Sequence, residues 1–273
     1  MPSLLKAIIK VIIMSKNIQI SILGKISGNV NADEVIGDRI TIKKMYSTTG
    51  EVLPFVSSRA IKYSIRQAFK EKGFEIDPLY EDRDATGSLR LADSGRPDKY
   101  IDNDLFGYML TTGRTREAQG EVFRRHAPIA LSYFKALRDT PIKSEFAARF
   151  PRNIDSDSNP VPFEVEVAEF IGRLNVLIYD YIGDFTISTR KTSEVTIDKL
   201  EEEERKNRLG VFLDVLLTPS YVLPRRTNTL SIPEYYCSLI SMSNSGVFPI
   251  YQYLDYIYQG GDVSINISKL SEL

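Results

Sequence analysis

The chain has 273 residues, enough for one elaborated domain or two small ones with a substantial core. Hydrophobic residues make up 42% and charged residues 26%, and the formal net charge is −1, as in an ordinary soluble globular protein. The single cysteine, Cys237, excludes an intramolecular disulfide and fits a reducing cytosol, so we expect a cytoplasmic protein.

The first residues are apolar, but we do not expect them to form a membrane segment. Lys6 and Lys10 interrupt them, no small-residue cleavage site follows, and about 20 apolar residues are needed to span a bilayer. Met14 stands directly before Ile18–Ser27, whose alternation predicts the first strand. We therefore expect residues 1–13 to be an upstream extension and expect no membrane partner.

A basic region follows this strand. Between Arg39 and Gly73, eight lysines and arginines face two glutamates, a local excess of six positive charges in a chain of net charge −1. Such a patch is typical of a site for a polyanion. The basic residues are Arg39, Lys43, Lys44, Arg59, Lys62, Arg66, Lys70 and Lys72.

Part of this region is predicted to be a helix over Ser58–Lys72. Ser57 or Ser58 suits the N-cap, Gly73 suits the C′ position, and apolar residues spaced from Ile61 predict a buried stripe. Lys62, Arg66 and Lys70 recur every four residues on a neighbouring face, close to Arg59. Free amides, serine hydroxyls and the helix dipole at the start suit a phosphate. The alternative is a solvated basic face on an ordinary surface helix.

The middle of the chain contains two polar segments, residues 74–96 and 147–162, which separate the predicted helices and strands. Residues 74–96 are acidic and predict a loop or insertion, and residues 104–109 and 114–124 predict short helical pieces. Residues 129–137 predict a strand. The turn-rich segment 147–162 carries Arg149 and Arg152.

The remaining elements are a strand over Val165–Asp180, a helix over Leu200–Leu217, a strand over Glu234–Met242 and a tyrosine-rich helix over Val247–Tyr258. The loop between the second helix and the following strand holds Arg225, Arg226 and Asn228, which could donate hydrogen bonds to phosphate or 2′-hydroxyl oxygens. The alternative for this loop is an exposed connector.

The core order is β-α-β-β-α-β, so we predict an α+β fold of the ferredoxin-like type. In that fold the two helices cover one sheet face and the other face is free. We predict a single domain over residues 1–273, with insertions at 74–125 and 141–162.

Catalytic and metal motifs are weak. The only histidine, His126, shares no motif with Cys237, and no glycine-rich phosphate cradle occurs. The pairs Asp102/Asp104 and Asp155/Asp157 could hold Mg²⁺, but in polar loops they are more often turn and cap residues. We expect no metal site, no cofactor and no enzymatic activity.

Several segments together resemble a known family. GNVNADEVIGDRITIKKMY, GEVLPFVSSRAIKYSIRQAF, YIDNDLFGYM, RRHAPIALSYFKAL, FEVEVAEFIGRLNVLIYDYIGDF, KNRLGVFLDVLL and PRRTNTLSIPEYYCSLIS match, in order and spacing, the DevR-type "autoregulator" proteins of CRISPR systems. These belong to the repeat-associated mysterious protein (RAMP) superfamily and form the backbone of type I Cascade complexes. The resemblance implies a modified RRM-like core, with residues 74–125 as a finger-like insertion and 141–162 as a thumb hairpin.

The resemblance also implies function. Copies of the chain would form a helical filament along a CRISPR guide RNA (crRNA) and leave its bases free to pair with target DNA. Other Cascade subunits and a separate effector nuclease would be partners. The implied guide contacts are Ser57, Ser58, Arg59, Lys62 and Arg66, with Arg149 and Arg152 on the thumb.

Three alternatives stay open at this point. Asp33 lies on the loop predicted after the first strand, where related type III backbone subunits carry an RNA-cleaving aspartate; a turn or capping role is the alternative for it. A transcriptional autoregulator would bind nucleic acid too, but no helix-turn-helix or heptad pattern is present. An RRM-like protein for other RNAs is the third, and the aromatic RNP signature is absent.

Overall fold

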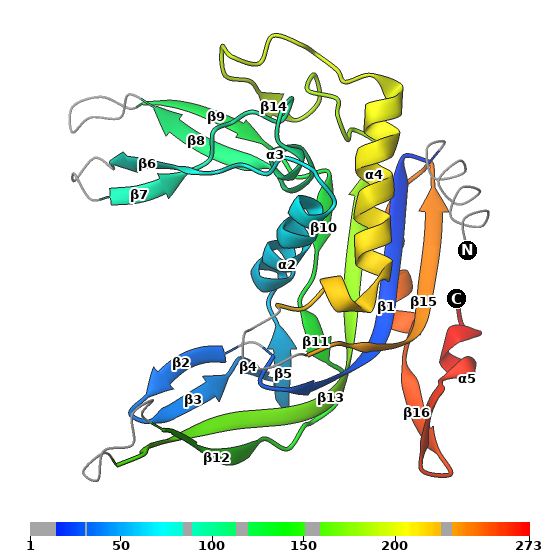
Figure 1. Ribbon diagram of the computed structural model, residues 1–273. Helices are drawn as coiled ribbons and strands as arrows, with labels where there is room; N and C mark the ends of the chain where they lie inside the picture. The colour runs from blue at the N-terminus through cyan, green and yellow to red at the C-terminus, as the bar shows by residue number, and fades with distance from the viewer. Residues whose placement is uncertain (1–14, 31, 84–88, 113–119, 151–158, 225–230) are drawn as a thin grey trace.

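A computed structural model describes residues 15–30, 32–83, 89–112, 120–150, 159–224 and 231–273. Its centre is a curled antiparallel sheet in the order β15-β1-β13-β11-β5-β4, with few helices, so the fold is mixed α+β (Figure 1). The strands are β1 (Asn17–Gly28), β4 (Lys44–Tyr46), β5 (Val52–Val56), β11 (Phe134–Ala136), β13 (Val161–Tyr179) and β15 (Glu234–Ser243), and β10 (Ile129–Leu131) also pairs with β13.

The predicted strand over residues 129–137 is split in two. The chain leaves the ladder at Ser132 and Tyr133, between β10 and β11. Nearby, Gly172 of β13 permits a close approach to β11, because a Cβ there would lie 2.8 Å from the Lys135 carbonyl oxygen. A side chain at this position would therefore push the two strands apart.

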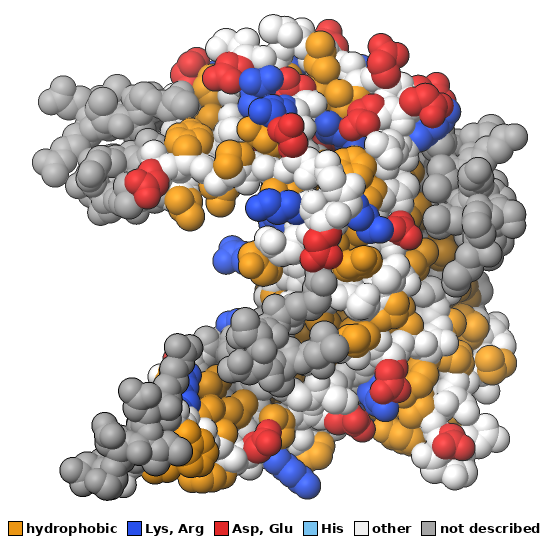
Figure 2. All heavy atoms as spheres, in the orientation of Figure 1, with side chains coloured by type: hydrophobic (Ala, Val, Ile, Leu, Met, Phe, Trp, Pro, Cys, Tyr) orange, Lys and Arg blue, Asp and Glu red, His pale blue; other side chains and the backbone are white. Residues whose placement is uncertain are grey.

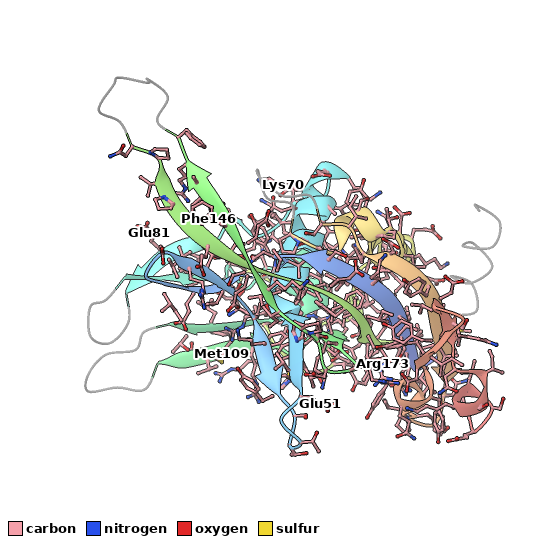
Figure 3. All side chains as sticks on the ribbon, turned by 90° about the horizontal axis from the view of Figure 1, so that it is seen from below. Glu51, Lys70, Glu81, Met109, Phe146 and Arg173 are labelled. Atoms are coloured by element: carbon pink, nitrogen blue, oxygen red, sulfur yellow. The ribbon has the colours of Figure 1, made fainter. Side chains whose placement is uncertain are left out.

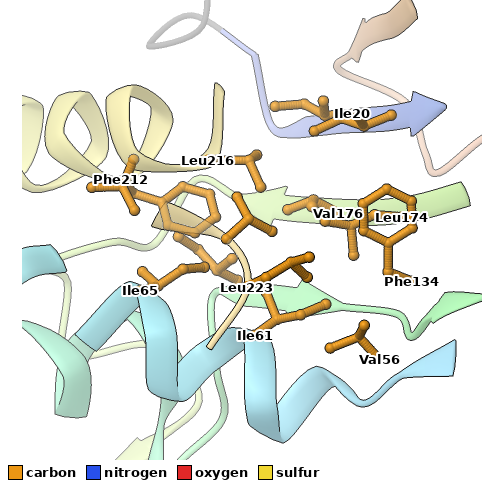
Figure 4. Packing of buried hydrophobic residues seen from close by; sticks show 14 of the residues in the cluster. Ile20, Val56, Ile61, Ile65, Phe134, Leu174, Val176, Phe212, Leu216 and Leu223 are labelled. Atoms are coloured by element: carbon orange, nitrogen blue, oxygen red, sulfur yellow. The ribbon is translucent and has the colours of Figure 1, made fainter. Parts of the chain in front are cut away.

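Two helices cover one face of the sheet and form the main core with it. α2 (Ser58–Glu71) and α4 (Glu202–Leu217) were predicted from sequence almost to the residue. Their buried stripes pack onto the even-numbered face of β1 and β13, because side chains alternate along a strand. Figure 4 shows this packing, with Ile61, Ile65, Phe212 and Leu216 from the helices and Ile20, Leu174 and Val176 from the sheet. The short 3-10 helix η1 (Pro219–Tyr221) follows α4.

The opposite sheet face is partly covered, which corrects the expectation of a free face. Leu23 and Ile171 are buried there against Leu254 and Tyr256. The predicted tyrosine-rich helix over residues 247–258 is also wrong: the chain forms a short 3-10 helix and then a hairpin, because Leu254 and Tyr256 gain burial on the sheet. These C-terminal elements are η2 (Ile250–Tyr253), β16 (Tyr256–Gln259), β17 (Asp262–Ile265) and α5 (Ile267–Leu270).

An upper arm projects from the top of the sheet beside α2 (Figure 1). It contains β6 (Tyr80–Arg83), β7 (Leu89–Ala92), α3 (Ile101–Phe106), β8 (Tyr108–Thr112), β9 (Glu121–Arg125) and β14 (Thr189–Arg190). The helical prediction over 114–124 is wrong in its described part, where residues 121–124 pair with β8. Gly107, with φ of +70°, turns the chain from α3 into β8 where a Cβ would lie 2.4 Å from the Arg125 carbonyl oxygen.

A lower arm projects from the other end (Figure 1). It is built from β2 (Ala32–Ile36), β3 (Arg39–Ile42), β12 (Lys143–Arg149) and the first half of β13, in the order β2-β3-β13-β12. β12 pairs with β13 from Lys143↔Val167 to Arg149↔Val161. The arm is thus a β-ribbon continuous with the longest strand of the core sheet.

Candidate nucleic-acid interface

A cleft lies between the two arms, and α2 lies at its floor. Figure 2 shows this hollow, with lysine and arginine side chains gathered at its base over α2. The basic edge predicted from the sequence is therefore brought to a concave, open surface between two projecting ribbons. This arrangement fits a linear polyanion running through the cleft.

The start of α2 is built to receive an anion. Ser57 is the N-cap, and its Oγ accepts a hydrogen bond of 3.2 Å from the Ala60 amide. The amides of Ser58 and Arg59 precede the first intrahelical hydrogen bond, from the Ile61 amide to the Ser57 carbonyl. The first turn holds no acidic residue, and the Arg59 side chain is exposed. Amides, dipole and guanidinium thus favour the same negative charge.

Lys62 and Arg66 continue this basic edge over an aromatic ring. The Lys62 ammonium lies 5.1 Å and the Arg66 guanidinium 5.3 Å from the centre of the Phe106 ring of α3. Burial lowers the pKa of Lys62 below the ordinary lysine value of 10.5, and the charge of Arg66 lowers it further. A phosphate at this point would relieve both effects, since it would supply the missing opposite charge.

This environment predicts a pH-dependent affinity. Because burial lowers the pKa of Lys62, the wild-type protein should begin to lose affinity for a single-stranded oligonucleotide at a pH below the ordinary lysine pKa of 10.5. Lys62→Arg keeps its charge in this range, so its affinity should stay level. Anisotropy titrations with a 2′-O-methyl oligonucleotide, which resists alkaline hydrolysis, measure both curves. Parallel curves for the two proteins would contradict a role for Lys62.

Arg66 is held in place by α3. Its Nε donates a 2.8 Å hydrogen bond to Asp102, whose side chain is only 4% exposed and also accepts the Asp77 amide at 2.9 Å. The Asp102/Asp104 pair therefore serves arginines: the carboxylate of Asp104 binds Arg125 and Arg208. In the described part of the chain, no cluster of His, Cys, Asp and Glu has the geometry of a metal site.

The cations before α2 lie at the root of the lower arm and are already paired. Arg39 binds Glu164 at 2.6 Å, and Lys44 binds Glu166 at 2.9 Å. Burial opposes ionisation of Glu166, but hydrogen bonds from Lys44 and the Ile42 amide bring its pKa below the ordinary value. Lys43 is half-buried beside β5, where its carbonyl accepts the Phe55 amide. These residues are not part of the α2 surface.

The other predicted contacts divide into two groups. Arg149 ends β12 on the lower arm, where its guanidinium lies 5.4 Å from the Phe163 ring centre. Arg152, Arg225, Arg226 and Asn228, with Asp155 and Asp157, lie outside the described residues.

The two residues considered for catalysis have other settings. Asp33 lies in strand β2 rather than on the predicted loop. Burial raises the pKa of the Cys237 thiol, as expected for an unreactive cysteine.

Phe106 and Asp102 were not predicted as part of the site. Both come from the segment YIDNDLF, and the signal that could have found them is the run of polar residues inside a short helix. Asp102, Asn103 and Asp104 are all buried, which is unusual without fixed partners. Asn103 donates to Asp77 at 2.8 Å and to Ser94 at 3.2 Å. The segment therefore ties the upper arm to the cleft floor.

The fold and the cleft define an α+β protein with a basic floor between two β-ribbon arms. A family model described as "CRISPR-associated negative auto-regulator DevR/Csa2" matches residues 27–224, and the chain belongs to this family. This confirms the family resemblance drawn from the sequence. No curated protein matches the chain. Within the described residues, no helix is long and apolar enough to cross a membrane.

Two solved structures align with part of the chain. A chain of a "CRISPR RNA-guided surveillance complex" aligns with a TM-score of 0.47 at 14% identity, over 80% of this chain and 66% of that one. A chain of a "CRISPR RNA-guided surveillance complex, pre-nicking" aligns with a TM-score of 0.48 at 12% identity, over 80% of this chain and 76% of that one. The chain thus spans slightly less than two thirds of the first of these relatives.

Proposed function

We propose that this chain is the guide-RNA-binding backbone subunit of a type I CRISPR surveillance complex. The observation that carries the proposal is the basic edge of α2, with an acid-free first turn, on the floor of an open cleft. Membership of a CRISPR-associated family supports it. The subunit would grip backbone phosphates irrespective of sequence and leave the bases to pair with target DNA.

The strand order supports an RRM-like core for this function. Strands β15, β1, β13 and β10/β11 follow one another in the antiparallel order of a β-α-β-β-α-β fold, with α2 and α4 on one face. In this proposal the upper arm is the finger and the β12–β13 ribbon is the thumb. Arg149 on the ribbon would then contact guide RNA held by the next copy.

Several copies would polymerise head to tail along the guide, since a heterologous contact that does not close generates a helix. The protein would be cytoplasmic and without catalytic activity of its own, and a separate nuclease would act after target pairing. The alternatives are Asp33-dependent RNA cleavage and transcriptional autoregulation. They remain as outcomes of the test below.

The test is to sequence RNA that co-purifies with the protein from its native host. Repeat-spacer guides support the proposal. Mixed cellular RNA indicates a general RNA-binding protein, and tight promoter binding without RNA indicates a transcriptional regulator. Target-RNA cleavage that is lost in Asp33→Ala would indicate the type III-like alternative.

If the proposed filament is correct, a change at the tip of the thumb should affect assembly on a guide without affecting the stability of the free subunit. Replacing residues 151–158 by a two-residue turn should leave the free subunit's Tm nearly unchanged, because the described β12–β13 pairs, from Lys143↔Val167 to Arg149↔Val161, are kept. The same change should abolish arrays of several copies on a long guide. Differential scanning fluorimetry measures the first property and native mass spectrometry the second. A large loss of Tm would show instead that the segment is part of the core.

A further inference from the structure

A row of ring and cationic side chains crosses the sheet face that lies away from the helices. Phe55 of β5 is directly opposite Lys135 of β11, and Lys135 is directly opposite Arg173 of β13. Residues in direct register on neighbouring strands share a face and lie about 5 Å apart. Figure 3 shows Arg173 on the far side of the sheet from Lys70 of α2. None of these residues belongs to the cleft floor described above.

Tyr133 extends the row into solvent. Its ring stacks on Phe55 with centroids 4.9 Å apart and an interplanar angle of 15°, and the residue is 46% exposed. The break between β10 and β11 holds it there: the Ser132 amide donates to the Asn175 carbonyl, and the Ser132 Oγ accepts from the Asn175 amide, both at 2.8 Å. A stacked aromatic pair on an open surface gives a ring platform on which a base can stack.

The charge beside the platform is positive. No carboxylate in the described part of the chain forms an ion pair with Lys135. Arg173 donates from Nη1 to the Leu254 carbonyl at 2.7 Å, while its Nε is buried without a partner among the described residues. The carboxylate whose charge acts on Arg173, Asp255, is already bound by Arg138 and Lys269. The row therefore offers one cation, Lys135, that has no ion pair among the described residues, while Arg173 is held by the Leu254 carbonyl and the Tyr251 ring.

The Phe55 end of the row lies next to the α2 end of the cleft floor. Phe55 is two residues before Ser57, the N-cap of α2, and β5 is next to the outermost strand of the core sheet. A nucleic-acid strand that passes the N-terminus of α2 would therefore reach Phe55 and Tyr133 after it rounds the edge of the sheet at β4. Two extended residues span at most about 7 Å, so the Cα atoms of Phe55 and Ser57 lie within that distance of each other.

We infer that Tyr133, Phe55 and Lys135 form a second contact surface for single-stranded nucleic acid, with a base stacked on Tyr133 and a phosphate at Lys135. The inference rests on the proposed function and extends its binding path to the other face of the sheet. Stacking on an aromatic side chain tolerates any base, which suits a subunit that binds irrespective of sequence. A folded protein partner is a poorer fit, because the exposed surface combines one ring with a lysine that has no ion pair in the described part of the chain.

The chain contains no tryptophan, so Tyr133→Trp introduces a unique fluorophore on the platform. A single-stranded RNA oligonucleotide added to this variant should quench the tryptophan emission at the same concentrations at which it binds by anisotropy. Tyr258→Trp, on the exposed β16 hairpin, is the matched control and should not respond. Wild-type anisotropy keeps the two proposals distinguishable: no binding at all refutes the proposed function, whereas binding without quenching in the Tyr133→Trp variant refutes only this inference.

Two further variants test the contacts themselves. Tyr133→Ala should weaken oligonucleotide binding about fivefold or more. Lys135→Ala should lower the slope of log affinity against log salt by about 0.7, whereas Lys206→Ala removes the same charge from α4, where Glu202 binds it, and should not. Equal losses for Lys135→Ala and Lys206→Ala would show a general charge effect and overturn the inference. Unchanged thermal unfolding of Tyr133→Ala would exclude misfolding as the cause of its weaker binding.

Discussion

The double variant Arg59→Ala/Lys62→Ala is expected to bind single-stranded RNA about 25-fold more weakly than the wild type at 0.1 M salt, whatever the RNA sequence. Each phosphate contact on a single strand adds about 0.7 to the salt slope, which corresponds to about fivefold in affinity at this concentration. The slope of log affinity against log salt should therefore fall by about 1.4. Filter binding between 50 mM and 400 mM salt (roughly the range over which such slopes are resolved) measures both quantities.

The structure offers a matched control for this result. Lys44→Ala removes a cation that Glu166 already binds at the root of the lower arm, so its effect on RNA affinity should be much smaller. Arg59 is exposed and Lys62 half-buried, so the double variant should remain folded. A folded double variant with unchanged affinity and salt slope would remove α2 from the interface, and with it the observation that carries the proposed function.

The second large effect is expected in stability. Asp104 is fully buried and binds two buried arginines, Arg125 at 2.6 Å and Arg208 at 2.9 Å, besides the Gly183 amide at 3.0 Å. Asp104→Asn keeps the size of the side chain but leaves two guanidinium groups without their shared negative charge. Breaking a buried ion pair in this way costs about 3–5 kcal/mol of unfolding free energy.

Urea unfolding followed by circular dichroism measures this loss. Asp214→Asn is the control, since it removes a carboxylate that binds Lys72 at the surface with 46% of its side chain exposed. Exposed ion pairs contribute about 0–1 kcal/mol, so the control should unfold close to the wild type. Similar midpoints for Asp104→Asn and Asp214→Asn would show that the α3 network does not stabilise the fold.

The elements that could be predicted are those with a local pattern. The helix expected over residues 58–72 is observed as Ser58–Glu71, and the strand expected over 165–180 is observed as Val161–Tyr179. In both, the period of the buried side chains distinguishes helix from strand without knowledge of the neighbours. The N-cap of α2 was readable for the same reason, because Ser57 bonds a group only three residues away.

The C-terminal segment could not be predicted in this way. Its tyrosines fit a helical spacing, but Leu254 and Tyr256 are buried against Leu23 and Ile171, which are more than 80 residues earlier in the chain. The energy of burial on the sheet outweighs local helix propensity, which differs by less than about 1 kcal/mol per residue between such side chains. A pattern read from one segment contains no information on a surface supplied by others.

The same distinction separates the two parts of the candidate site. The sequence by itself determined the excess of positive charge between Arg39 and Gly73 and the basic edge of α2, because charge and helical period are properties of one segment. Only the tertiary structure decided which cations are available. Arg39 and Lys44 are bound by Glu164 and Glu166, more than 120 residues away, and Arg66 is bound by Asp102, while Arg59 is exposed and Lys62 lies over Phe106 at the floor of a cleft. Whether a charge can meet a ligand depends on its partners in space, and these are set by the packing of the whole chain.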